Sequence, residues 1–154
     1  MKRLLVLFAL VGFLTSLPIK YAYSATALAE KKIKEAKTCI HNVSVQEAKK
    51  LIKNGSVILD AREYPEYAAG HIPGAIWAPR GLIDFQGPTW FPDKNKTYLT
   101  YCKTGGRGVI VAYELKELGY DNVVNLDGGF DAWERDGEPI EKGAPEGPGK
   151  GIKK

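Results

Sequence analysis

Cys102 is the residue of this 154-residue chain whose surroundings are best suited to covalent chemistry. It opens a short loop that combines a thiol, a hydroxyl, two cations and two glycines: Cys102, Lys103, Thr104, Gly105, Gly106, Arg107. With Gly108, the glycines allow the loop to curl so that its backbone N–H groups face inward and attract an anion. The cations and the positive end of a following helix favour the thiolate, which is the nucleophilic form. We therefore expect Cys102 to react without a histidine base and to hold an anionic adduct such as a persulfide.

Two alternatives give Cys102 a structural role. Cysteine is often simply buried at the end of a strand, but burial leaves the glycines and Arg107 unexplained. A Cys39–Cys102 disulfide is the other alternative for an exported chain with two cysteines. We expect no permanent bridge, because about 130 residues bury a core without one. A transient redox switch stays open if the two Cα atoms lie within about 7 Å.

Alternating strand and helix patterns surround this loop. Apolar runs of strand length occupy residues 57–61, 75–78, 97–101 and 123–126. Helical patterns occupy residues 63–69, 108–118 and 130–135, and a further helix runs from a capping box at Ser44 and Glu47 to a stop at Asn54. The alternation predicts an α/β domain with a mainly parallel sheet. Cys102 follows the third strand, at the sheet edge where such domains bind ligands. We expect residues 80–96 to be irregular.

The first 24 residues form a segment of their own. Lys2 and Arg3 precede an almost wholly apolar run over residues 4–17, and Ala22-Tyr23-Ser24 has the small-x-small form of a cleavage site. This layout predicts a secretory signal peptide and export, most naturally to the periplasm. An uncleaved membrane anchor is the weaker alternative, because a spanning helix needs roughly 20 apolar residues.

The rest of the chain divides into three parts. We expect a linker or short N-terminal helix over residues 25–38, the domain over 39–137, and a disordered Gly/Pro/Lys tail over 138–154. Without the three cations of the leader, 19 of the 22 Lys and Arg residues face 18 Asp and Glu residues. This balance gives no basic face for nucleic acid. Two histidines and two cysteines are too scattered for a metal site.

Four spaced motifs resemble the single-domain rhodaneses, a family of sulfurtransferases. They occupy residues 57–62, 70–75, 101–107 and 126–133, and the resemblance covers residues 40–137. It implies a five-stranded parallel sheet with helices on both faces, a persulfide on Cys102, and an anion cradle formed by residues 103–108. Two positions depart from the family. Thr104 and Gly108 stand where many members have serine, which puts the preference for a sulfur donor in question.

The resemblance implies the transfer of sulfane sulfur from thiosulfate or polysulfide to cyanide or a thiol, without a cofactor. A sulfur carrier that delivers persulfide sulfur to a protein partner is the alternative from a different class. Phosphatases of this fold have one more residue between the cysteine and the arginine. Because Cys102 to Arg107 is a six-residue loop, a phosphatase or arsenate reductase is the weaker enzyme alternative.

Asp60 and Arg62 lie at the end of a neighbouring strand, where they could hydrogen-bond the loop or pair with each other. We expect structural support from both, because partly buried charges usually pair. His71 lies in a Gly-His-Ile-Pro-Gly turn, so a structural role is expected for it as well. Trp90 and Phe91 could form a pocket wall or cover the sheet.

Overall fold

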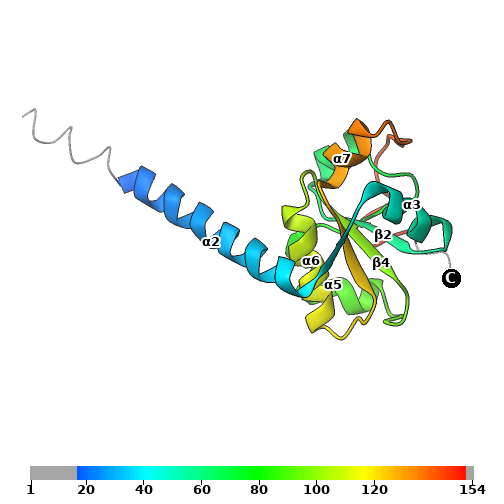
Figure 1. Ribbon diagram of the computed structural model, residues 1–154, viewed down its shortest axis with the longest axis horizontal. Coiled ribbons are helices and arrows are strands. Elements are labelled where there is room, and N and C mark those ends of the chain that lie inside the picture. The colour runs from blue at the N-terminus through cyan, green and yellow to red at the C-terminus, as the bar shows by residue number, and fades with distance from the viewer. Residues whose placement is uncertain (1–16, 152–154) are drawn as a thin grey trace, which may run out of the picture.

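The computed structural model describes residues 17–151 of the chain. Helix α2 (Leu17–Cys39) extends from the domain and begins inside the predicted leader, whose first 16 residues lie outside the described residues (Figure 1). Residues 25–38, expected as a linker or short helix, are part of α2. Within residues 17–151, no helix combines the length and the apolarity that a bilayer span needs.

Five parallel strands form one sheet in the order β1-β5-β4-β2-β3. The strands are β1 (His41–Val43), β2 (Val57–Asp60), β3 (Ile76–Trp77), β4 (Tyr98–Tyr101) and β5 (Val123–Leu126). This sheet confirms the α/β class and the five parallel strands. The apolar runs predicted β2 to β5 but not β1, which has only three residues, two of them polar. β1 is fixed by its partner β5 instead, with Asn42 opposite Asn125.

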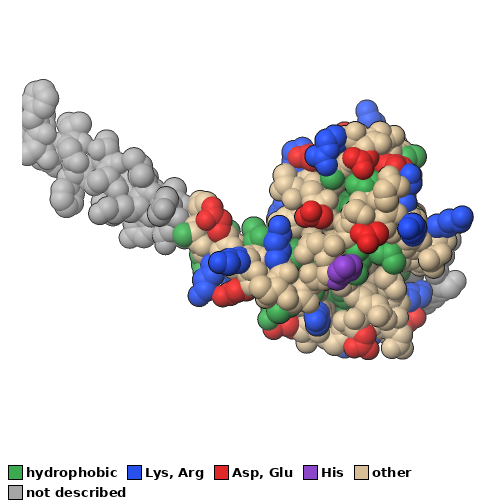
Figure 2. Space-filling view, in the orientation of Figure 1, with side chains coloured by type: hydrophobic (Ala, Val, Ile, Leu, Met, Phe, Trp, Pro, Cys, Tyr) green, Lys and Arg blue, Asp and Glu red, His purple; other side chains and the backbone are tan. Residues whose placement is uncertain are grey.

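Helices cover both faces of the sheet (Figure 1). On one face α3 (Val45–Lys53), α4 (Tyr64–Ala69) and α7 (Gly129–Arg135) pack over one apolar cluster. On the other, the end of α2, α5 (Ile83–Trp90) and α6 (Gly106–Glu117) pack over a second cluster, which contains Cys102. The predicted capping box of α3 is confirmed, since Ser44 N donates to Glu47 Oε2 at 2.8 Å and Glu47 N donates to Ser44 Oγ at 3.3 Å. On the face shown in Figure 2, acidic and basic side chains are interspersed.

Residues 80–96 were expected to be irregular, and this prediction was wrong for 80–90. A 3₁₀ turn, η1 (Arg80–Leu82), leads into α5. The helix forms because Ile83, Gly87 and Phe91 follow one another at intervals of four residues, the spacing of one helix face. Ile83 and Phe91 are fully buried, and Gly87 lies against α6 at Leu115. The glycine and Pro88 hid this pattern in the sequence.

The C-terminal segment also differs from the expected disordered tail over residues 138–154. Residues 138–151 run along the domain, where His71 and Glu141 exchange two backbone hydrogen bonds of 2.8 and 2.9 Å. Gly149 N donates to Trp77 O on the edge strand β3 at 2.8 Å. The segment is held because it supplies backbone partners to groups that an exposed sheet edge leaves unpaired.

Candidate active site

Cys102 directly follows β4, the central strand, and is only 2% exposed. The first turn of α7 binds the loop that starts there: Phe130 N donates to Cys102 O at 2.7 Å, and Asp131 N donates to Lys103 O at 3.0 Å. These bonds direct two loop carbonyls toward α7. The loop then enters α6 at Gly106, so the positive end of a 12-residue helix follows the cysteine.

Glycines allow the close approach of the loop and α7. Gly129 has a φ of +60°, and a Cβ there would collide with Cys102 O and lie 2.8 Å from Gly105 N. Gly105 itself has a φ of +95°, a left-handed conformation that glycine adopts without strain. The Asp127-Gly128-Gly129 turn before α7 therefore also holds the reactive loop.

Packing against the sheet explains why residue 108 is a glycine, which the sequence alone did not show. A Cβ at this position would collide with Asn125 Oδ1 and lie 3.0 Å from the backbone of Tyr101. A serine at this position would therefore not fit against this sheet. The departure from the family pattern follows from the neighbouring Asn125 on β5.

Arg107 forms a two-pronged ion pair with Glu66 of α4, a residue that sequence reasoning missed. Its Nη1 and Nη2 donate to Glu66 Oε2 and Oε1, both at 2.7 Å. The hydrogen bond from Arg107 lowers the pKa of Glu66 to about 2. The pKa of Arg107 is raised, first by Glu66 and to a lesser degree by the nearby Cys102. The Glu66 carboxylate also accepts from Glu63 N at 3.1 Å, which caps the start of α4.

The other loop residues form the exposed rim. Lys103 donates to Asp131 at 2.9 Å, and Thr104 is exposed. Because Asp131 offsets Lys103 and Glu66 offsets Arg107, neither cation adds an unopposed charge at Cys102. An anion at Cys102 would therefore depend on the backbone amides and the positive end of α6 more than on the two cations.

Asp60 and Arg62 pair with each other in the interior. Arg62 Nη2 donates to Asp60 Oδ2 and to Gly70 O, both at 2.6 Å, and the guanidinium lies 4.2 Å from the centre of the Phe130 ring. The pair thus connects the end of β2 to the turn after α4 and to α7. Its contact with Phe130 places it behind the helix that holds the loop.

The remaining singled-out residues have structural surroundings. His71 is buried, stacks on Tyr67 at 3.8 Å, and has its Nδ1 3.0 Å from Tyr67 O. Phe91 and Trp133 are buried in the two apolar clusters. Cys39 and Cys102 are both free thiols. Among residues 17–151, no group of three or more His, Cys, Asp or Glu side chains is placed to hold a metal ion.

The model of the rhodanese-like domain family matches residues 44–136 of the chain, which include the whole cysteine loop and its α7 support. This chain belongs to the rhodanese-like family. A sulfurtransferase of Allochromatium vinosum is 38% identical over 91 residues, covering 59% of this chain and 81% of the relative. A thiosulfate sulfurtransferase of Pseudomonas fluorescens is 34% identical over 89 residues, covering 57% and 79%.

Other similar proteins show that this rhodanese-like domain occurs in different contexts. The mitochondrial protein High Arsenic Content 1 of Arabidopsis thaliana is 31% identical over 104 residues, and the chain spans only 62% of that protein's length. A Rhodopseudomonas palustris structure described as a possible tyrosine phosphatase has a TM-score of 0.67 at 30% identity, covering 73% of this chain and 93% of that one. A Pseudomonas aeruginosa thiosulfate sulfurtransferase also has a TM-score of 0.67, at 27% identity, covering 76% and 23%.

The Glu66–Arg107 pair of this rhodanese-like domain predicts a loss of stability in acid. Folding lowers the pKa of Glu66 from its ordinary 4.5 to about 2. The pair therefore contributes fully above pH 4.5, and its contribution is lost as the pH falls toward 2. Because both side chains are about one third exposed, we expect Glu66→Gln to cost about 1 kcal/mol at pH 7.

Urea unfolding at several pH values measures this effect. The difference between Glu66→Gln and the parent chain is expected to shrink between pH 4.5 and pH 2. Glu30→Gln, on the exposed part of α2, is the control and should match the parent throughout. A Glu66→Gln difference that stays constant over this range would show that the ion pair is not its cause.

Proposed function

We propose that this rhodanese-like domain transfers sulfane sulfur through a persulfide on Cys102. Thiosulfate or polysulfide is the donor, and cyanide or a thiol is the acceptor. The observation that carries the proposal is the six-residue loop from Cys102 to Arg107, which lies at the end of the central strand and is held by the first turn of α7. Relatives that are named sulfurtransferases support the same class of reaction.

The two half-reactions need only the thiol and the cradle. The Cys102 thiolate attacks the outer sulfur of thiosulfate, the S–S bond breaks, and sulfite leaves with the bonding electron pair. The product is a negatively charged persulfide, which the loop amides and the start of α6 stabilise. Cyanide then attacks the terminal sulfur, thiocyanate leaves, and the Cys102 thiolate returns. No electrons are gained or lost over the cycle.

The low exposure of Cys102 favours a second candidate, a carrier that hands its sulfur to a protein acceptor. Such a carrier would turn over slowly with small acceptors. Rapid, repeated production of thiocyanate from thiosulfate and cyanide would count against it. The likeness to a possible tyrosine phosphatase is tested with a phosphate monoester, from which we expect no phosphoryl group on Cys102.

Mass spectrometry of the thiosulfate-treated chain tests the proposal. We expect the peptide with Cys102 to gain one sulfur atom, because the thiolate takes the outer sulfur of the donor, and to lose it again when cyanide is added. Cys39→Ser should leave this result unchanged, since Cys39 is on α2 and outside the loop. If Cys102 gains no sulfur although iodoacetamide alkylates it, the cysteine is accessible and the proposed chemistry is wrong.

A further inference from the structure

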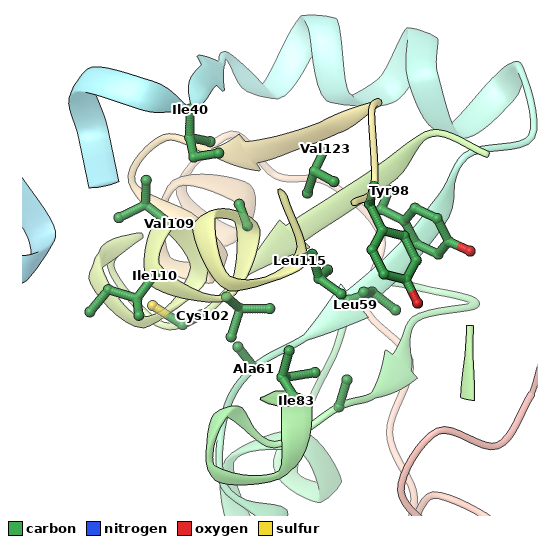
Figure 3. Packing of buried hydrophobic residues seen from close by; sticks show 14 of the residues in the cluster. Ile40, Leu59, Ala61, Ile83, Tyr98, Cys102, Val109, Ile110, Leu115 and Val123 are labelled. Atoms are coloured by element: carbon green, nitrogen blue, oxygen red, sulfur yellow. The ribbon is translucent and has the colours of Figure 1, made fainter. Parts of the chain in front are cut away.

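The last turns of α2 lie on the reactive loop. An ideal Cβ on Gly106 would be 3.0 Å from Ile33 Cδ1. Ala36 and Ile40 follow Ile33 along the chain, are 2% and 5% exposed, and belong to the same apolar cluster as Cys102. Figure 3 shows Ile40 and Cys102 within this cluster. Ile33 of α2 therefore lies against the loop at the start of α6, and Ala36 of α2 and Ile40 directly after it extend the apolar packing on this side of the sheet.

This cover is additional to the family domain. The match to the rhodanese-like family begins at residue 44, whereas α2 ends at Cys39. The helix is otherwise turned away from the domain: Leu28 is 56% exposed, and the helix extends outward in Figure 1. Only its C-terminal part, residues 30–39, reaches the Cys102 side of the sheet.

Something must move before a reagent meets the Cys102 sulfur, because the residue is 2% exposed. The loop itself is held by two backbone bonds from α7 and by the two-pronged Glu66–Arg107 pair. The end of α2 is held by apolar contact and by one exposed bond, from Lys116 Nζ to Cys39 O at 3.0 Å. Elements with few buried contacts and exposed hydrogen bonds open at the lowest free energy, so α2 opens before the loop.

We propose that residues 30–40 are a lid over Cys102, that Ile33 is the residue that closes it, and that the population of the open lid determines how fast reagents and sulfur donors reach the thiol. Ile40, the single residue between α2 and β1, is the hinge. The part of this proposal that concerns sulfur donors rests on the proposed function. The part that concerns access to the thiol does not.

Chemical labelling of Cys102 tests the lid in the full chain. The Cys39→Ser background leaves Cys102 as the only thiol, and methyl methanethiosulfonate and dithiobis(nitrobenzoate) serve as a small and a bulky probe. When opening and closing are fast, the labelling rate follows the open population. We expect Ile33→Ala to raise the rate about tenfold with both probes, and Ile33→Val to raise it about twofold, as buried methyl groups are removed.

Leu28→Ala is the matched control, because it removes the same kind of side chain from an exposed position of the same helix. It should label at the parent rate. Circular dichroism and the melting temperature verify that each variant is folded, and the graded Ile33→Val result remains informative if Ile33→Ala does not fold. Equal labelling rates for the Ile33 variants, Leu28→Ala and the parent would overturn the lid.

The outcomes for the lid and for the proposed function are separable. If Cys102 takes no sulfur from thiosulfate but its labelling depends on Ile33, the lid stands and the sulfur chemistry fails. If Cys102 takes sulfur and its labelling ignores Ile33, the lid fails and the sulfur chemistry stands.

Discussion

Cys102→Ser is expected to reduce thiocyanate production from thiosulfate and cyanide by at least about 10⁴-fold, because the nucleophile of the proposed reaction is removed. A serine hydroxyl forms no persulfide. The substitution keeps the size of the side chain, and the loop bonds from Phe130 and Asp131 involve only backbone atoms of residues 102 and 103. We therefore expect the melting temperature to change by only a few degrees.

Cys39→Ser is the matched control for this experiment, since it removes the only other thiol of the chain. It should keep the parent rate of thiocyanate production. If transfer persisted in Cys102→Ser and disappeared in Cys39→Ser, the sulfur would be carried by Cys39, and our proposal would be wrong. Loss of transfer in both variants would indicate that the two thiols act together.

Gly129→Ala is expected to destabilise the fold by at least about 3 kcal/mol, through two effects that add. The left-handed φ of +60° costs roughly 1–2 kcal/mol for a residue with a Cβ. The Cβ also collides with Cys102 O and comes within 2.8 Å of Gly105 N and Lys103 O, so the loop and α7 must separate. The bond from Phe130 N to Cys102 O would then be lost, at a further cost of about 1–3 kcal/mol for a buried group.

Gly137→Ala separates the two effects in urea unfolding. Gly137 has a similar φ of +73°, but no atom lies within 4 Å of its Cβ position. It should therefore show only the backbone cost, about 1–2 kcal/mol. If the two variants lost the same free energy of unfolding, the close contact between Gly129 and the loop would contribute nothing to stability. Gly129→Ala should also lose thiocyanate production under conditions in which it is still folded.

The elements that could be predicted from the sequence are those marked by patterns of neighbouring residues. Strands β2 to β5 are continuous apolar runs, and the capping box at Ser44 marks the start of α3. β1 could not be predicted in this way, because its stability comes from pairing with β5, 83 residues away in the Asn42–Asn125 bond. The predicted signal peptide and export to the periplasm stay predictions.

The candidate site likewise has a part that local sequence predicts and a part that depends on contacts between distant residues. The cysteine loop is contiguous, so its residue types and spacing were sufficient to single it out. Its partners are remote in sequence: Glu66 lies 41 residues before Arg107, and Asp131 lies 28 residues after Lys103. Charges that appeared free in the sequence are therefore paired in the fold. The packing of α2 against the loop could not be predicted for the same reason, because no sequence pattern in residues 25–38 indicates which part of the domain they contact.

The place of β4 in the middle of the sheet determines how the amides around Cys102 exchange with solvent. Central strands exchange only when the whole domain unfolds, whereas edge strands and terminal helices exchange through local opening. Amides of Tyr98–Tyr101 should therefore be among the slowest in deuterium oxide, and those of α2 and the adjoining edge strand β1 among the fastest. The thiol is thus attached to the strand that opens least often, while the helix that covers it belongs to the part of the molecule that opens most often.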